Sequence, residues 1–286
     1  MVDLQTHSIY SDGSRTPAEL VKEAREKGIC AIALTDHDTI AGLPEFLEAG
    51  RANGVITVPG VEISVEAELP RSGHLHLLGL FVDYHNRSFK EKLEFLRTHR
   101  KIRARKIVEK LNEMGIKISD EDVQALAGKA AIGRPHFARI LKNKGVVNSL
   151  QEAFARYIGK GKPAYVNKVK FTEKEAIQII KDAGGLTILA HPHLMNYEKE
   201  EELERKILYL HSLGLDGIET YYPDLSPTLA EHLLEFAREY RLAVSGGSDY
   251  HGENKDGIAL GTGNGNLHIP DTVYRDLYRR WRRLNG

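Results

Sequence analysis

Imidazole and carboxylate side chains recur in this sequence at comparable places, directly after short apolar segments. Glu62, for example, follows segment 56–61, and His191 follows segment 186–190. A lone histidine is usually a surface or hydrogen-bonded residue, but core packing needs no such set, and burying its members unpaired would be costly. The set comprises Gln5, His7, Asp36, His37, Asp38, Glu62, His191, His193, Asp249 and His251, with His74 and His76 at the start of segment 75–81.

A cluster of divalent metal ions would supply the partners that these groups lack. Imidazole nitrogens and carboxylate oxygens are common ligands of such ions. If the apolar segments are parallel strands of a barrel, their carboxyl ends face one mouth, where residues distant in the sequence converge. The pattern therefore predicts a multinuclear metal site. Asp36 is expected to orient an imidazole from outside the metal sphere, and Asp38 to cap the following helix.

Alternating helical and apolar segments predict the parallel sheet that this site requires. Residues 16–19 read Thr-Pro-Ala-Glu, a capping box that begins a helix, and Gly28 ends this helix before the apolar segment 30–34. Repeated βα units are typical of a parallel sheet, whether open or closed into a barrel. Further helices are expected at about 41–53, 172–183, 200–213 and 227–240, and further strands at about 55–58, 75–81, 186–190, 216–221 and 242–245.

The middle of the chain interrupts this alternation. A long, basic helical pattern covers residues 88–114, and shorter helical patterns follow at about 119–127, 135–144 and 149–158. No strand is expected until about residue 164. We therefore expect one barrel domain formed by residues 1–98 and 167–286, into which a small helical domain, residues 99–166, is inserted.

Composition limits the classes of function. Of the 286 residues, 41% are hydrophobic and 28% charged, and the 40 basic and 40 acidic side chains cancel, which leaves no overall field for a nucleic-acid coat or a membrane surface. Cys30 is the one cysteine, so an internal disulfide and a cysteine-based zinc finger are excluded. Neither a secretory signal nor a transmembrane segment is visible, and we expect a cytoplasmic protein without an obligate protein partner.

The motifs around these residues resemble those of the PHP (polymerase and histidinol phosphatase) superfamily. Segments 3–8, Asp-Leu-Gln-Thr-His-Ser, and 11–13, Ser-Asp-Gly, are similar to the opening motif of that family. Later motifs follow in order at 35–38, 59–64, 76–79, 190–192 and 247–252. The resemblance implies an α/β fold, a distorted (β/α)7-type PHP barrel, and metal-dependent phosphoesterase activity.

The inserted region narrows the resemblance to one branch of the superfamily. Residues 132–136, Ile-Gly-Arg-Pro-His, and residues 157–166 are similar to PHP phosphoesterases that remove the 3′-phosphate of nucleoside 3′,5′-bisphosphates, some of which trim short RNA from the 5′ end. The resemblance therefore implies a small phosphorylated substrate, a nucleotide or short oligoribonucleotide, and a substrate-binding role for the insertion.

The family pattern also implies two to three divalent metal ions, which we expect to be manganese, with zinc or iron as alternatives. The first position would use Gln5, His7, Glu62 and Asp249, the second Asp12, His37 and His251, and the third Glu62, His76 and His191. The family has histidine where this chain has Gln5. Because an amide oxygen is a weaker ligand than an imidazole nitrogen, the first position is expected to bind its metal less tightly.

Attack on phosphorus by a metal-activated hydroxide is the implied chemistry. The catalytic residues would be Asp12, His37, Glu62, Asp249 and His251. Arg134 is expected to clamp a phosphate through its planar guanidinium, and His136 to lie beside it at the start of a helix. His193 or a water molecule would protonate the leaving group. The basic segment 99–106 would either contact the anionic substrate or form a solvated helix face.

Two other functions are compatible with the sequence. A histidinol-phosphate phosphatase shares the barrel, but the helical insertion argues against this function. A nucleotide-binding protein with weakened catalysis is the second alternative, because Gln5 replaces a family ligand.

Overall fold

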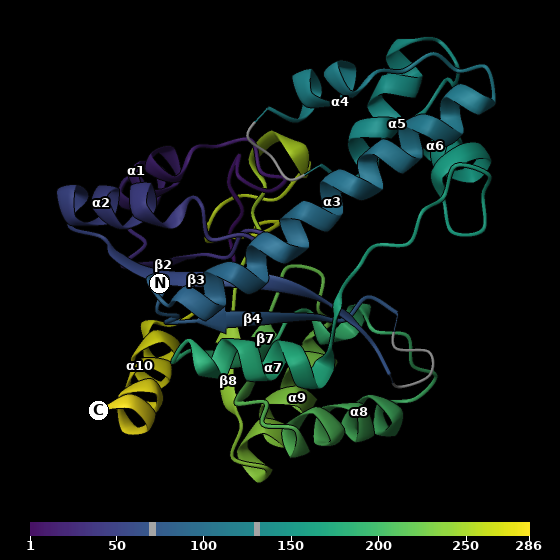
Figure 1. The fold of residues 1–286 in the computed structure, drawn as a ribbon. Coiled ribbons are helices and arrows are strands. Elements are labelled where there is room, and N and C mark those ends of the chain that lie inside the picture. The colour runs from purple at the N-terminus through teal and green to yellow at the C-terminus, as the bar shows by residue number, and fades with distance from the viewer. Residues whose placement is uncertain (69–72, 129–131) are drawn as a thin grey trace. The chain divides into compact units, whose positions relative to one another are not determined.

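The computed structural model describes residues 1–68, 73–128 and 132–286, and the chain divides into two compact units (Figure 1). The first unit comprises Met1–Leu93 and Lys170–Gly286, and the second comprises Glu94–Val169. The insertion expected at residues 99–166 lies within the bounds of the second unit.

Eight strands form one sheet in the described part of the first unit. Along the sheet their order is β1-β2-β3-β4-β6-β7-β8, and β5 pairs with β3 beside this path. The strands are β1 Val2–Asp3, β2 Ala31–Leu34, β3 Ile56–Glu66, β4 His76–Leu80, β5 Phe171–Thr172, β6 Leu186–Leu189, β7 Gly217–Tyr221 and β8 Ala243–Gly246.

The sheet is mixed, which corrects the expectation of a parallel sheet. β4 runs antiparallel to both of its neighbours, β3 and β6, whereas the other pairs are parallel. The physical reason is the length of the connection. Residues 67–75 join β3 to β4, and a parallel crossover requires about a dozen residues or more.

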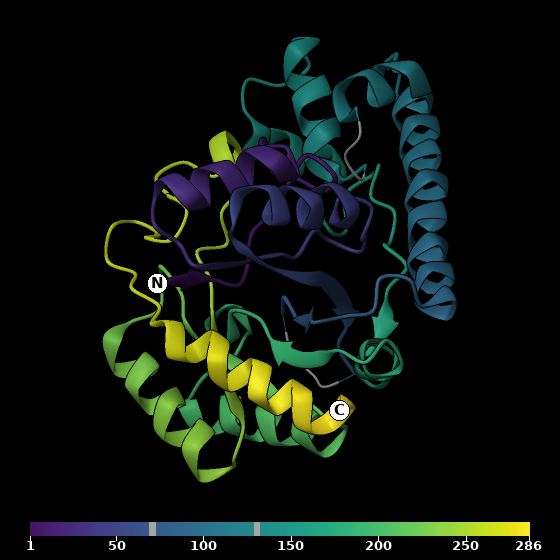
Figure 2. The same ribbon diagram turned by 90° about the vertical axis from the view of Figure 1, so that its left-hand side faces the viewer.

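The sheet curls until its first and last strands meet. Leu4 N donates to Gly246 O at 3.0 Å, and His7 N donates to Tyr250 O at 2.9 Å. Seven strands therefore follow one another around the distorted barrel that the family resemblance implied. Helices α1 and α2 lie side by side beside this sheet (Figure 2).

Most helices of the first unit begin and end near the residues that the sequence indicated, but α10, Asp271–Asn285, was not predicted. Thr16 forms a full capping box with Glu19 at the start of α1, and Thr172 does so with Glu175 at the start of α7. Gly54 ends α2 with a left-handed φ of 67°. The helices are α1 Pro17–Glu26, α2 Leu43–Asn53, α7 Glu173–Asp182, α8 Glu200–Ser212, α9 Pro227–Glu239 and α10 Asp271–Asn285, with 3-10 turns at Pro192–Leu194 and Gly252–Asn254.

The core of the barrel fixes these strand ends in place. Leu4, Ile188 and Leu277 are fully buried in one apolar cluster that joins the strands to α10. Burying such side chains stabilises the fold by about 1.5–3 kcal/mol each. The polar residues that follow the strands are therefore held on a rigid frame.

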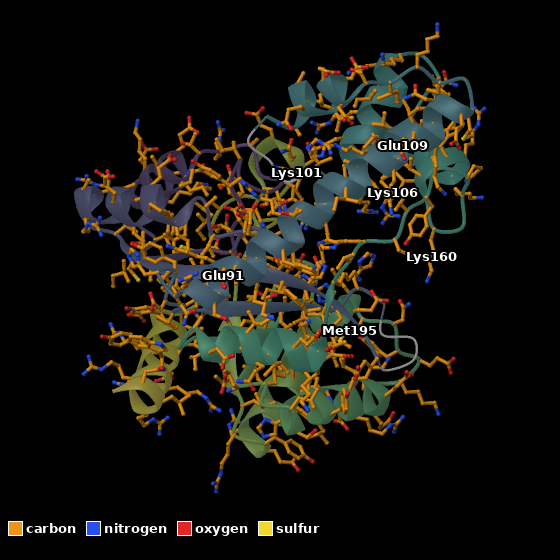
Figure 3. All side chains as sticks on the ribbon, in the orientation of Figure 1. Glu91, Lys101, Lys106, Glu109, Lys160 and Met195 are labelled. Carbon is orange, nitrogen blue, oxygen red and sulfur yellow. The ribbon has the colours of Figure 1, made fainter. Side chains whose placement is uncertain are left out.

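The second unit is helical and has a core of its own. α3, Arg87–Glu113, enters it from the first unit, and Lys101, Lys106 and Glu109 lie along this helix (Figure 3). α4 Asp120–Ala127, α5 Arg134–Asn143, α6 Leu150–Ala153 and the π-helical turn Phe154–Ile158 follow. Their core includes Leu111, Phe137 and Leu141. Among the described residues, no helix is long and apolar enough to cross a membrane.

Candidate metal centre

Strand ends bring the predicted ligands together at one edge of the sheet in the first unit. A parallel bridge pairs His37, beyond β2, with Glu62 in β3. His76 begins β4, and because β4 is antiparallel, its first residue lies at the same edge as the ends of the parallel strands. The remaining candidates follow β1 (Gln5, His7, Asp12), β6 (His191) and β8 (Asp249, His251).

Glu62 occupies the centre of the cluster, and only 1% of its surface is exposed. Its Oε1 lies 2.6 Å from His76 Nδ1 and 3.0 Å from His191 Nε2. Its Oε2 lies 3.1 Å from His7 Nε2 and 3.6 Å from His37 Nδ1. One carboxylate thus faces four imidazoles, as a ligand shared between metal ions would.

Two further carboxylates complete the cluster. Asp249 Oδ1 lies 3.1 Å from His7 Nε2. Asp12 lies 3.3 Å from His251 Nε2 and 3.7 Å from His37 Nε2. The rings of His7 and His251 are stacked, with their centroids 4.2 Å apart.

The candidate ligand atoms form three groups, in each of which they lie within 4.8 Å of one another. Compared with the predicted sets, His7 joins the second group, and His37 stands in the third group where His191 was expected. His191 nevertheless contacts Glu62 directly. The division of ligands among metal positions stays a prediction. The groups are His7, Glu62 and Asp249; His7, Asp12, His37 and His251; and His37, Glu62 and His76.

Unpaired buried atoms show that these residues fit metal ions. Among the described residues, His37 Nδ1 and His191 Nδ1 have no hydrogen-bond partner. Leaving a buried polar atom unsatisfied costs about 1–3 kcal/mol. A divalent cation accepts electron pairs from imidazole and carboxylate alike, and so it would satisfy the atoms that the protein leaves without a partner.

Gln5 lies within this cluster and is fully buried. Its Nε2 donates to Glu62 Oε2 at 3.3 Å, whereas its Oε1 has no partner among the described residues. A half-turn of the amide would exchange these two atoms. Gln5 therefore lies beside Glu62, and its neutral amide oxygen is the one atom with which it could ligate a metal ion.

Electrostatics keep two carboxylates and one imidazole of the cluster in metal-binding protonation states, whereas at His7 burial would lower the pKa but Asp249 and Glu62 raise it well above its usual range. Burial would raise the pKa of Glu62, but His37 and His76 hold it well below its usual range. Burial would also raise the pKa of Asp249, but His7 keeps it well below its usual range. Burial lowers the pKa of His37 to about 4, which leaves its imidazole neutral and able to ligate at neutral pH.

Asp36 and Asp38 contribute structure in ways that differ from expectation. Asp36 accepts hydrogen bonds from the hydroxyls of Ser8 and Ser11, both at 2.6 Å, and so fixes the segment after β1 instead of an imidazole. Asp38 accepts from Ser64 N at 2.9 Å and has a left-handed φ of 54°. The prediction that Asp38 caps α2 was wrong, because Gly42 holds that position.

Three residues that the sequence analysis did not single out form hydrogen bonds with candidate ligands and so help to fix their positions. Tyr222 and Lys255 both donate to Asp249 Oδ2 at 2.8 Å, which leaves its Oδ1 toward the cluster. Glu219 is fully buried and accepts from His191 N at 2.8 Å, where the His191 backbone has a φ of 29°. In the sequence, the signal that could have indicated Glu219 was an acidic residue inside the apolar strand β7.

His193 lies on the 3-10 turn beside this cluster, and its ring centroid is 4.8 Å from that of Tyr222. Both ring nitrogens lack a hydrogen-bond partner among the described residues. Burial, with a smaller effect of His191, lowers the pKa of His193 to about 4. The ring is therefore neutral at neutral pH and free to bond a ligand.

Arg134 and His136 lie in the second unit, at the start of α5. His136 Nδ1 accepts from Gly133 N at 3.0 Å and thereby caps the helix. The Arg134 guanidinium stands 5.5 Å from the ring centroids of both Phe154 and Tyr165. The structure thus shows a capping role for His136 and an aromatic setting for Arg134, and their contact with substrate stays a prediction.

The basic segment 99–106 divides between two environments. Lys101, Arg105 and Lys106 are exposed, as a solvated helix face requires. Arg103 is half-buried and donates from Nε to Val166 O at 2.8 Å. A solvated helix face therefore does not describe Arg103, and contact of the segment with an anionic substrate stays a prediction.

Comparison with known proteins places this site in a family. A family model described as the PHP domain matches residues 3–253. The chain is 36% identical over 250 residues to a 5′-3′ exoribonuclease of Haemophilus influenzae, covering 87% of this chain and 89% of that protein. It is 32% identical over 281 residues to a 3′,5′-nucleoside bisphosphate phosphatase of Chromobacterium violaceum, covering 98% and 97%.

A solved structure gives the same result. A presumed metal-dependent phosphoesterase from Bifidobacterium adolescentis matches with a TM-score of 0.81 and 30% sequence identity, over 97% of this chain and 95% of that one. The motif resemblance, the α/β barrel and the predicted class of enzyme are thereby confirmed. The chain is a phosphoric ester hydrolase, and it belongs to the PHP domain family.

Proposed function

We propose that this enzyme removes the 3′-phosphate of nucleoside 3′,5′-bisphosphates and trims short RNA from the 5′ end at the same centre. One observation carries the proposal: a buried carboxylate, Glu62, faces four imidazoles in a chain that matches a bisphosphate phosphatase along 98% of its length. The exoribonuclease relative favours the second activity, because both reactions break a phosphate ester of a ribonucleotide.

Each residue of the cluster has a defined task in this proposal. Glu62 and Asp249 would hold the metal ions, which we propose to be manganese, together with the imidazoles around them. When bound, such ions lower the pKa of water and neutralise charge that develops on the phosphoryl oxygens. Tyr222 and Lys255 keep one oxygen of Asp249 turned toward the cluster.

His193 is assigned a binding role. Because its pKa is about 4, the His193 ring is a neutral imidazole at neutral pH and cannot act as a general acid in the imidazolium form. We therefore propose that His193 hydrogen-bonds the substrate as a neutral imidazole and that water protonates the leaving oxygen. Arg134, on the second unit, is proposed to clamp a phosphate, since its planar guanidinium can form two parallel hydrogen bonds.

The test is a phosphate-release assay with manganese-loaded protein and adenosine 3′,5′-bisphosphate. We expect release of inorganic phosphate that stops when the metal is chelated and resumes when it is restored. Histidinol phosphate is tested in parallel. If phosphate is released faster from histidinol phosphate than from the bisphosphate, the enzyme is the alternative phosphatase. Absence of release from the bisphosphate, with metal binding verified, would contradict the proposal.

Weak catalysis with tight binding is the remaining alternative. Gln5 motivates it, because the motif resemblance implies an imidazole at the position of this buried amide. Calorimetry with the same bisphosphate separates the cases: tight binding without phosphate release would favour a nucleotide-binding protein.

A further inference from the structure

A pocket in the first unit contains none of the predicted metal ligands. Segments 57–59, 81–84 and 183–184 line it together with one face of α10, the yellow helix in Figure 2. Its volume is about 470 Å³. Pockets of about 300–1,000 Å³ with mostly apolar and aromatic walls are typical binding sites of small molecules.

This pocket and the metal centre lie at opposite edges of the sheet. Thr57 is the second residue of β3, whereas Glu62 lies about 16 Å further along the same strand. Gly184 precedes β6, and His191 follows it. Phe81 follows β4, which runs antiparallel to its neighbours, so it lies at the same edge as Thr57 and Gly184. The pocket is therefore a separate place on the first unit.

Four aromatic rings stack on one another in the wall of the pocket. The ring centroids of Tyr274 and Tyr278 are 5.9 Å apart, with 18° between the ring planes, and those of Tyr278 and Trp281 are 5.8 Å apart, with 29°. Phe81 stacks on Trp281 at 5.6 Å. Tyr278 nevertheless remains 38% exposed. Nearly parallel rings with an exposed member provide a surface on which a further planar ring can stack.

The turn that supplies Phe81 to this wall has an uncommon backbone conformation. Phe81 has a φ of 61°, in the left-handed region that bulky side chains avoid. Val82 N donates to Pro59 O at 3.2 Å, and Asp83 N donates to Ala183 O at 2.7 Å, which holds the turn in place. Residues in such conformations occur preferentially at sites that bind ligands.

Two hydrogen-bond acceptors lie beside the rings. Asn285 Nδ2 donates to Trp281 O at 3.1 Å, which leaves Asn285 Oδ1 to accept. Asp83 accepts from His85 N through Oδ1 at 2.9 Å, and its Oδ2 has no hydrogen bond within the described part of the chain. Adenine, guanine and cytosine carry an amino group whose N–H bonds suit such acceptors, whereas uracil has none.

An arginine without an acidic partner lies next to the pocket. Arg282 is one helical turn beyond Tyr278 and three residues before Asn285, so the three share one face of α10. Its side chain is exposed and pairs with no acid among the residues that the structure describes. Arg275 on the same helix, in contrast, lies 2.6 Å from Asp271. The planar guanidinium of Arg282 could hold a phosphate beside a stacked base.

We propose that this pocket binds an amino-bearing nucleobase together with the phosphate of the same nucleotide. The base stacks on Tyr278 and Trp281, its amino group donates to Asp83 and Asn285, and its phosphate contacts Arg282. The ligand is a nucleoside monophosphate, either free or as a unit of an RNA strand. The site stands apart from the metal centre, so the inference goes beyond the proposed function.

The test uses the fluorescence of Trp281, which is the one tryptophan of the chain and so reports on this pocket. Adenosine 5′-monophosphate is titrated into the manganese-loaded protein, with excitation where adenine does not absorb. We expect saturable quenching, and about fivefold weaker binding of uridine 5′-monophosphate, whose base has no amino group. A short oligoadenylate is titrated in the same way. Tighter binding of the oligoadenylate would identify RNA as the source of the nucleotide, and tighter binding of the monophosphate a free nucleotide.

Two variants with matched controls assign the signal to the pocket. Tyr278→Leu keeps an apolar side chain but removes the ring, and we expect about tenfold weaker binding. Tyr240→Leu changes a half-buried tyrosine on α9, outside the pocket, and should alter binding by less than about twofold. Arg282→Gln should weaken binding by about fivefold, whereas Arg283→Gln, at an exposed neighbour on another face of α10, should not. Arg282→Gln also serves if Tyr278→Leu does not fold.

The proposal is overturned if adenosine 5′-monophosphate leaves the Trp281 fluorescence unchanged. It is also overturned if Tyr278→Leu and Arg282→Gln bind as their controls do, because the signal would then come from nucleotide bound at the metal centre. Equal binding of the uridine and adenosine monophosphates would overturn the assignment of an amino-bearing base. Phosphate release from adenosine 3′,5′-bisphosphate is measured separately in the same preparations, and its absence from all of them would count against the proposed function and not against this pocket.

Discussion

Replacing Gln5 by histidine tests whether this position belongs to the metal centre. The Gln5 side chain is fully buried, its Nε2 lies 3.3 Å from Glu62 Oε2, and its Oε1 is unpaired. Gln5→His supplies a neutral nitrogen ligand in place of a weak amide oxygen. We expect metal affinity to rise by about 10- to 100-fold, which corresponds to about 1.4–2.7 kcal/mol of binding free energy.

The measurement is a competition between the protein and a chelator of known affinity, with manganese and then zinc. The rate of phosphate release is followed at the same time, because a better-occupied first position should also raise turnover at low metal concentration. Gln178→His is the matched control. Gln178 is exposed on α7, where its amide donates to Asp182 Oδ1 at 2.7 Å, so this change should leave metal affinity unaltered.

Equal metal affinity in the folded Gln5→His variant and the wild-type protein would refute the reasoning. Gln5 would then be a hydrogen-bonding residue that only orients Glu62. A rise in metal affinity without a rise in turnover would still show that residue 5 can ligate the metal, and it would favour the nucleotide-binding alternative.

Three further changes test other parts of the argument. Asp249→Ala should lose metal and phosphate release together, since its Oδ1 faces His7 at 3.1 Å, and unchanged metal content would contradict the ligand assignment. Arg134→Ala should keep its metal but raise KM for the bisphosphate by about tenfold, and a loss of kcat with unchanged KM would contradict the clamp. Gly247→Ala should lower the free energy of unfolding by about 1–3 kcal/mol in a denaturant titration, because the new Cβ would lie 2.5 Å from Gln5 N, and full stability would show that this backbone can move.

Local sequence signals predicted most helices and strands, although not α10. Capping boxes at Thr16 and Thr172 act within one turn of helix, so they can be read without knowledge of the fold. The direction of β4 could not be read in this way. Alternating βα units led to the prediction of a parallel sheet, and the short connection 67–75 was the evidence against it.

The members of the candidate site were predictable, but their relations were not. His76 and His191 were expected because imidazoles at strand ends are conspicuous in sequence. The contact between Lys255 and Asp249, in contrast, depends on the path of the loop after β8, which no periodic pattern records. Arg103 was part of a basic segment with two interpretations, and its burial and its bond to Val166 O, which distinguish it from Arg105, are not visible in the sequence.

The antiparallel direction of β4 is what allows His76 to join the cluster. The register of β3 and β4 pairs Ser64 with His76 and Glu62 with Leu78. Glu62 and Ser64 are two residues apart and point to the same face of the sheet, and the same holds for Leu78 and His76. His76 Nδ1 consequently reaches Glu62 Oε1 at 2.6 Å. A slip of one residue in this register would turn His76 to the opposite face of the sheet. The length of the connection between β3 and β4 helps to set the register. The third group of ligands therefore depends on that length as much as on its own side chains.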